Sequence, residues 1–222
     1  MTFSVRLVVL LGLLLAAMMA LAENVAAADA SAHQVVRDAT QQVMDVVVEA
    51  DAYADEDPER YYQEVQAILD PVIDYRGFAR GVMGPYATSE RYRSLDEACR
   101  DQLRAQLYRF TEVMRLGLVR TYSKGLLAFG GSRIEVDDPA AEDKGKSKVS
   151  VRQLVYSDEA EPYVLFYQMG QDKGGNWKLR NVIIESVNLG EIYRNQFQAA
   201  AREHDGNLDT VIDTWTTVEV DT

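Results

Sequence analysis

The sequence predicts an α+β domain in which helices precede and follow a curved antiparallel sheet. Apolar residues recur at helical spacing up to about residue 125, at strand spacing between residues 133 and 187, and at helical spacing again afterwards. Short polar turns separate consecutive strand-like segments, which is typical of an antiparallel meander. The chain has 222 residues without internal repeats or linkers, so one domain with a sizeable core is expected.

Three helices are expected at the start of the domain. Residues 29–53 place valines at helical spacing. Asp57 and Pro58 form a helix start, with the aspartate at the N-cap and the proline at the first helical position, and this second helix would end before the proline at position 71. A short third helix over residues 74–83 would stop at a glycine-proline pair.

The longest helix is predicted to start at a capping box, Ser94 to Glu97, and to run to about residue 122. At 1.5 Å per residue it would be roughly 40 Å long, enough to back a whole sheet. Cys99, the only cysteine, is expected to be a small buried residue on this helix, so no internal disulfide forms. Apolar side chains at steps of three or four form one stripe: Cys99, Leu103, Leu107, Phe110, Met114, Leu118 and Tyr122.

About four strands are expected, over residues 133–137, 149–156, 163–169 and 177–187. In the last of them, simple alternation places Trp177, Leu179 and Ile183 on one face. Val182 and Ile184 would lie on the other face. Large apolar side chains on both faces indicate that something apolar covers each face. One cover would be a helix layer, and the other would be a second helix layer or a bound apolar molecule.

Helical signals return after the last strand. Asn188 and Glu191 have the spacing of a helix cap and its acidic partner, which predicts a helix through residue 204. Gly206 breaks this helix, and residues 208–215 form a last short one. Residues 216–222 are expected to be a tail.

The first residues have the layout of a secretory signal peptide. Arg6 precedes an uncharged apolar run over residues 7–22, and two A-x-A patterns end at Ala22 and Ala28. The run is shorter than the roughly 20 residues that a membrane-spanning helix needs. We therefore expect a signal peptide over residues 1–28, cleaved after Ala22 or Ala28, and a single domain over residues 29–215. Export without disulfides fits the bacterial periplasm.

No motif of metal, nucleotide or covalent chemistry occurs. The two histidines stand far apart, and H-E-x-x-H, C-x-x-C, Walker and G-x-S-x-G patterns are absent from the sequence. A net charge of −12 without a basic cluster argues against a nucleic-acid binder. A solvated helix face explains the arginines scattered between residues 91 and 120 as well as a binding patch does. The candidate acid–base groups, each typical of a helix cap, a strand end or a helix start, are Asp74, Glu185 and Glu191.

Three blocks of residues are similar to one known family. The first, residues 71–86, has a proline-x-x-aspartate-aromatic helix followed by a glycine-containing turn. The second is the long helix with Phe110, Leu118 and Tyr122. The third, residues 177–197, ends in tyrosine-arginine-x-glutamine-phenylalanine, which is the most specific part. Together they resemble the toluene-tolerance, or MlaC-like, family of periplasmic phospholipid carriers of Gram-negative bacteria, over about residues 35–212.

The departures from the family pattern are modest. Met83 stands where leucine is usual, Arg180 and Asn181 replace a common tyrosine-aspartate pair, and Asn188 stands where serine is frequent. They bear on strand edges and a cap, and therefore more on the identity of the lipid than on the fold.

The resemblance implies a shuttle that moves phospholipid between an outer-membrane lipoprotein complex and an inner-membrane ABC transporter complex, which maintains outer-membrane lipid asymmetry. It implies no catalytic residue, metal or cofactor, because the phospholipid is cargo, and we expect a monomer that binds no nucleic acid. Two chains of about 16 carbons expose about 30 methylenes, and leaving these in water costs on the order of 25 kcal/mol. A lipid therefore needs a carrier to cross an aqueous compartment.

The acyl tails are expected in an apolar cavity between the concave sheet face and the helices. Periodicity selects apolar residues without separating cavity lining from core, so the lining set is a hypothesis. Two other functions fit the same pattern: a small-molecule enzyme that uses a pocket carboxylate such as Asp74 or Glu185, and an adaptor with a filled core. The candidate lining residues are Phe78, Val82, Met83, Leu107, Phe110, Met114, Val151, Leu165, Tyr167, Trp177, Val182 and Ile184.

Overall fold

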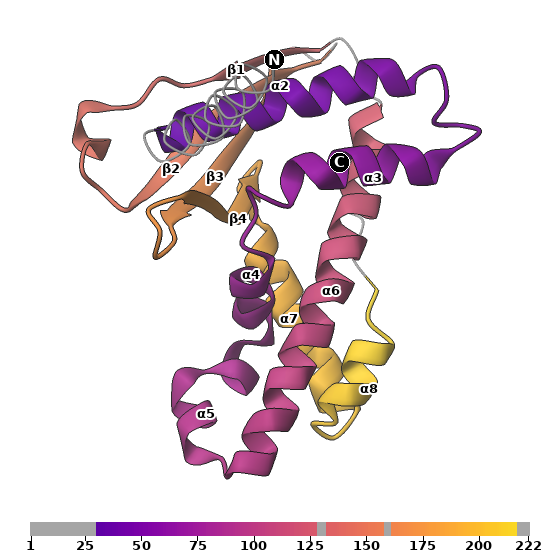
Figure 1. The fold of residues 1–222 in the computed structure, drawn as a ribbon, viewed down its shortest axis with the longest axis vertical. Helices are drawn as coiled ribbons and strands as arrows, with labels where there is room; N and C mark the ends of the chain where they lie inside the picture. Colours follow the sequence, from indigo (N-terminus) through magenta and orange to yellow (C-terminus); the bar gives the residue numbers. More distant parts are fainter. Residues whose placement is uncertain (1–29, 128–131, 158–160, 217–222) are drawn as a thin grey trace, which may run out of the picture.

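The computed structural model describes residues 30–127, 132–157 and 161–216 and confirms the predicted α+β class. Figure 1 shows a broad end formed by the sheet with α2 and α3, and a narrow end formed by helices. The helices before the sheet are α2 (Ala32–Ala50), α3 (Pro58–Leu69), α4 (Tyr75–Met83), the 3-10 helix η1 (Gly84–Ala87), α5 (Ser89–Ser94) and α6 (Glu97–Leu127). The helices after it are α7 (Leu189–Glu203) and α8 (Leu208–Asp213).

The sheet is the predicted antiparallel meander. Its strands pair in chain order, and every neighbouring pair is antiparallel. A fifth strand of two residues follows a tight hairpin, in which Glu185 and Ser186 have positive φ angles of 47° and 73°. This hairpin ends the fourth strand earlier than the predicted residue 187. The strands are β1 (Arg133–Val136), β2 (Lys148–Tyr156), β3 (Tyr163–Gln171), β4 (Trp177–Ile184) and β5 (Val187–Asn188); a short 3-10 turn, η2 (Ala141–Asp143), precedes β2.

The predicted assignment of faces in β4 is wrong because the strand contains a bulge, although apolar residues still lie on both of its faces. Gln168 pairs with Asn181, but the next residue, Met169, pairs with Leu179, so Arg180 is an extra residue without a partner in the register. Residues directly opposite each other share a face. The apolar residues Trp177, Leu179, Val182 and Ile184 therefore lie together on one face.

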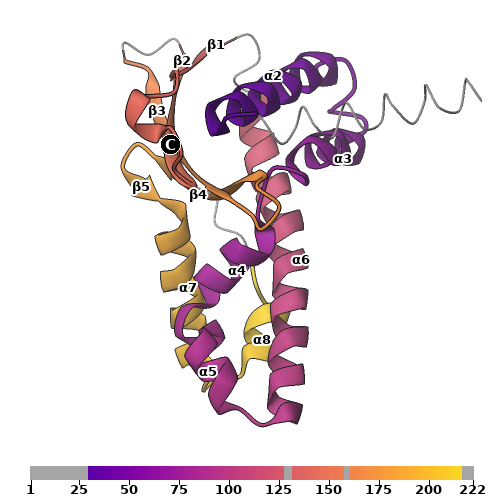
Figure 2. The ribbon, with the colours of Figure 1, turned by 60° about the vertical axis from the view of Figure 1, so that its left-hand side comes forward.

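This face, which we call the inner face, is the one that the helices cover. It carries Val151 and Tyr167, which lie opposite each other, and α2 packs over it. The outer face is mixed. Its exposed residues include Arg152, Phe166 and Gln168, and its half-buried residues include Leu154, Val164 and Ile183. Figure 2 shows the curved sheet with the helices on one side of it.

The start of the long helix differs from the prediction. Ser94 is the last residue of α5, a short helix that was not predicted and that Thr88 caps. The hydroxyl of Ser94 donates to the carbonyl oxygen of Arg91. The cap of α6 is Asp96, whose carboxylate accepts a hydrogen bond of 2.8 Å from the backbone N–H of Cys99. The predicted burial of Cys99 is also wrong: it is exposed, and the buried stripe begins at Leu103.

The narrow end has an aromatic core. Phe110 of α6 is fully buried, with its ring centroid 4.9 Å from that of Phe197 and 5.1 Å from that of Trp215. Tyr193 and Phe197 lie one turn apart on α7, and both are fully buried. The sequence block that carries the family resemblance thus supplies side chains that hold α7 against α6.

Asp74 connects the narrow end to the sheet. One carboxylate oxygen accepts from the backbone N–H of Gly77, 2.8 Å away, which confirms the predicted helix cap. The other lies 2.6 Å from the guanidinium of Arg180, the bulged residue. The backbone N–H of Asp74 also donates to Leu179, and Leu179 donates to Val72, so this segment covers part of the β4 edge.

Replacing Phe110 with alanine is expected to lower the free energy of unfolding by about 3–5 kcal/mol, because it leaves a cavity in the aromatic core. Urea denaturation measures this change. Tyr108, on the same helix and 69% exposed, is the matched control; its replacement with alanine should change stability by about 0.5 kcal/mol or less. Equal losses in the two variants would contradict the described core.

Substitutions of Asp74 should separate its two contacts. Asn retains the cap but loses the ion pair, whereas Ala loses both. We expect Asp74→Ala to cost about 1–2 kcal/mol and Asp74→Asn less than about 1 kcal/mol, since the ion pair is partly exposed. The measurement is again urea denaturation, and a larger loss for Asn than for Ala would contradict the assigned roles.

Candidate functional site

The inner face of the sheet brings together six of the predicted lining residues. Tyr167 lies between Val151 and Val182 in the register, and Leu165 lies opposite Ile184. Trp177 joins them through the bulge in β4. These six side chains come from three strands and share one apolar surface.

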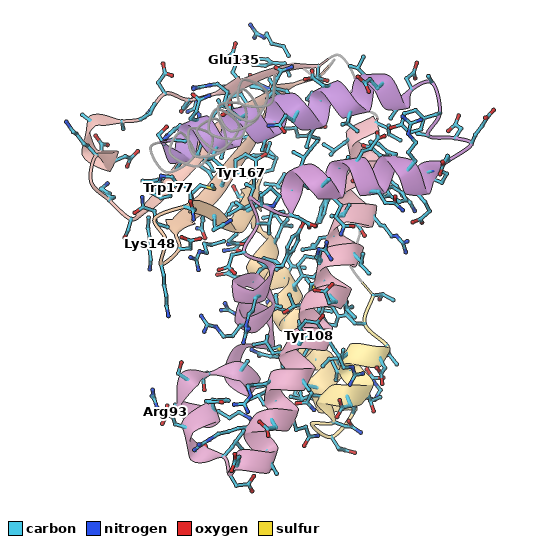
Figure 3. The ribbon with its side chains drawn as sticks, viewed as in Figure 1. Arg93, Tyr108, Glu135, Lys148, Tyr167 and Trp177 are labelled. Atoms are coloured by element: carbon cyan, nitrogen blue, oxygen red, sulfur yellow. The ribbon has the colours of Figure 1, made fainter. Side chains whose placement is uncertain are left out.

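Helix α2 covers one part of this surface. Ala32 and Val36 form a buried cluster with Val151 and Met169, and Tyr167 and Trp177 pack against it. A hydrogen-bonded chain crosses the same contact: the hydroxyl of Tyr167 donates to Gln153 over 2.7 Å, and Gln153 donates to Thr40 of α2 over 2.8 Å. Burial raises the pKa of Tyr167, so its hydroxyl stays neutral. Figure 3 labels Tyr167 and Trp177 at the broad end, near α2.

The helices of the narrow end cover another part of the inner face. Val182 and Ile184 pack against the helical core, which α4, α6, α7 and α8 build. The remaining predicted lining residues all belong to this core or pack against it: Phe78, Val82, Met83, Leu107, Phe110 and Met114. Five of these six side chains are buried and Phe78 is half-buried, so most of them belong to the core in this structure.

Leu165 lies between the two covered parts. It is half-buried, and it packs against none of the three clusters of buried side chains. Val155 and Tyr163, its neighbours on the inner face, are also half-buried. Apolar surface therefore stays uncovered on the inner face around Leu165.

The apolar stripe of α6 becomes less buried toward the broad end of the molecule. Met114 is fully buried, whereas Leu118, Tyr122 and Leu126, at successive helical turns, are half-buried. The hydroxyl of Tyr122 lies 3.1 Å from that of Tyr193, and burial raises the pKa of Tyr122, so this wall remains uncharged. Uncharged walls of this kind are compatible with acyl chains.

Two pockets are described, and neither is lined by a predicted lining residue. One, of about 410 Å³, lies between the ends of α2 and α6 and is lined mainly by Val47, Val48, Ala50 and Leu127. Val48 is 63% exposed there, and the sequence analysis did not single it out. The other, of about 210 Å³, lies at the narrow end among α5, α6 and α8.

The candidate acid–base residues have structural contacts. Asp74 caps α4 and pairs with Arg180, and the carboxylate of Glu185 accepts from the backbone N–H of Val164 beside the hairpin. Glu191 stands in the first turn of α7 and is exposed. Within the described ranges, no group of three or more His, Cys, Asp and Glu side chains could hold a metal ion. In the same part of the chain, no helix has the length and apolarity needed to cross a bilayer.

Comparisons with known proteins agree on one family. The family model described as MlaC protein matches residues 37–217. The toluene tolerance protein ttg2D of Pseudomonas putida is 31% identical over 184 residues, which cover 82% of this chain and 79% of that protein. A phospholipid-binding protein from Ralstonia solanacearum, solved in complex with a phospholipid, has the same fold, with a TM-score of 0.67 at 20% identity over 83% of this chain and 94% of that one. The chain therefore belongs to the MlaC family of periplasmic lipid carriers and is not an enzyme.

Proposed function

We propose that this protein binds one phospholipid with its acyl tails against the inner face of the sheet and carries it across the periplasm. The observation that supports this location most is the uncovered apolar surface around Leu165, in a member of a lipid-carrier family. The relative of the same fold from Ralstonia solanacearum was solved with a phospholipid, which supports the class of cargo.

The tails would lie between the inner face and the half-buried stripe of α6. Leu165, Ile184 and Val182 would form the sheet wall, and Leu118 and Tyr122 the helix wall. Phe110 and the other enclosed core residues would then support these walls without contacting the lipid. Fewer of the lining residues predicted from the sequence would therefore contact the acyl tails. The headgroup would remain outside.

Direction would come from the partners of the carrier. Acyl chains gain little free energy on moving from a bilayer into an equally apolar cavity, since both remove the same methylenes from water. We propose that an outer-membrane lipoprotein complex and an inner-membrane ABC transporter complex load and unload the protein, which would maintain outer-membrane lipid asymmetry.

Export would place the carrier between these complexes. The signal peptide predicted for residues 1–28 and the tail beyond residue 216 lie outside the described residues. We propose a mature chain that begins after Ala22 or Ala28 and folds as one domain to residue 215. The intact mass of protein purified from a periplasmic extract should match one of these two cleavage products, and the mass of the full chain would contradict cleavage.

Filling the uncovered surface should displace the lipid. Leu165→Trp adds bulk on the inner face, whereas Phe166→Trp adds a similar ring on the outer face, where Phe166 is 37% exposed. Lipid is extracted from equal amounts of purified protein and measured by mass spectrometry. We expect near-stoichiometric phospholipid in the wild-type protein and Phe166→Trp, and several-fold less in Leu165→Trp.

The controls separate stability from binding. Overpacking costs about 1–3 kcal/mol, so urea denaturation must show that Leu165→Trp is folded under the conditions of purification. A wild-type protein without lipid would contradict the carrier function. Full lipid in Leu165→Trp would leave the function intact but contradict the proposed location.

A further inference from the structure

The arginines of this acidic protein divide into two groups by position. Every arginine from Arg76 to Arg100, and both arginines of α7, lack a carboxylate within ion-pair distance among the described residues. Every other described arginine has such a partner. Unneutralised guanidinium groups are thus confined to the narrow end, although the whole chain has a net charge of −12. Of the two interpretations that the sequence leaves open for arginines of this region, a solvated helix face does not explain this division.

Several of these arginines share one side of the narrow end. Arg76 and Arg80 are exposed one turn apart on α4. Arg194 reaches over from α7, and its Nε donates to the carbonyl oxygen of Gly81 over 2.9 Å, so its guanidinium lies against the C-terminal part of α4. Arg93 points outward from α5, below α4, in Figure 3. We call Arg76, Arg80, Arg93 and Arg194 the arginine face.

Carboxylates on the same helices do not cancel this charge. Helices α4, α5 and α7 contain six arginines, and their acidic residues are Glu90, Glu191 and Glu203. All three glutamates are exposed, and none lies within ion-pair distance of an arginine in the described structure. The arginine face is therefore a local excess of positive charge, and it attracts acidic surfaces at long range.

The composition of the face fits a protein partner better than a bilayer. Helices α4, α5 and α7 contain no lysine, and protein interfaces favour arginine over lysine. None of the large apolar side chains that are exposed in the described chain lies on these helices, so nothing on them would insert into a bilayer. A side chain added at Gly81 would meet nothing within 4 Å, so this position of α4, whose carbonyl oxygen accepts from Arg194, is open to a partner.

We propose that the arginine face docks on an acidic surface of a protein partner. This inference rests on the proposed function, because the partner would belong to one of the two membrane complexes that load and unload the carrier. Planar guanidinium groups bind carboxylates in a bidentate manner. An electrostatic contact without apolar anchors also dissociates readily, as a shuttle requires.

The test compares two charge reversals of equal size. Arg76→Glu with Arg80→Glu alters the arginine face, and Lys144→Glu with Lys173→Glu alters two exposed lysines of the broad end that lack ion-pair partners in the described structure. Each lipid-loaded protein is titrated with the purified periplasmic parts of both complexes from the same bacterium. It is also titrated with vesicles made of equal parts phosphatidylcholine and phosphatidylglycerol.

We expect the wild-type protein to bind at least one of the two complexes, more weakly as salt is added. The arginine reversal should weaken this binding at least about tenfold, and the lysine reversal by less than about twofold. The variants should retain the wild-type lipid content, which shows that they are folded and loaded.

Three results would overturn the inference. The first is unchanged binding in the arginine reversal, and the second is equal weakening in both reversals, which would show an effect of total charge alone. The third is a wild-type protein that binds neither complex. If that protein bound the vesicles instead, the arginine face would be assigned to a membrane. Because lipid content is measured separately, none of these results is confused with a failure of the carrier function.

Discussion

The extra residue in β4 determines which side of the sheet is apolar. Without the bulge at Arg180, Trp177 and Leu179 would lie on the opposite face from Val182 and Ile184. With it, all four face the helices, and Ile183 is the one apolar residue of β4 on the outer face. The bulged residue also gains a role of its own, since its side chain pairs with Asp74 at the start of α4. One insertion thus concentrates the apolar residues of β4 on the inner face and connects the sheet to the helical end.

The apolar inner face has to be covered, and the helices cover it incompletely. Helix α2 packs over Val151 and Met169, and the helical core packs over Val182 and Ile184. The surface around Leu165 belongs to neither contact. Exposed apolar area costs roughly 25 cal/mol per Å², so a protein that kept such a gap empty would lose stability for no gain. In the function proposed above, acyl chains would complete this layer, and the cargo would become part of the fold that carries it.

Local signals in the sequence predicted the fold well where they acted alone. The caps at Asp57, Asp74 and Asn188 hydrogen-bond as their spacing indicated, and the strands alternate with short turns. The bulge escaped prediction because alternation assumes that no residue is inserted, and the face inferred for Trp177 and Leu179 was therefore wrong. The class of cargo came from the family resemblance. The residues that line the cavity could not be predicted in detail. In the structure Phe110 is buried and Leu165 is half-buried, whereas in the sequence both can be recognised only as apolar.

Photo-crosslinking tests directly where the acyl tails lie. The protein is loaded with a phospholipid that carries a diazirine near the end of one acyl chain, irradiated, digested and mapped by mass spectrometry. We expect labels on inner-face residues such as Leu165 and Ile184, and on the half-buried stripe of α6 at Leu118 and Tyr122. Labels concentrated on the outer face at Phe166, or in the pocket lined by Val48, would contradict the proposed location.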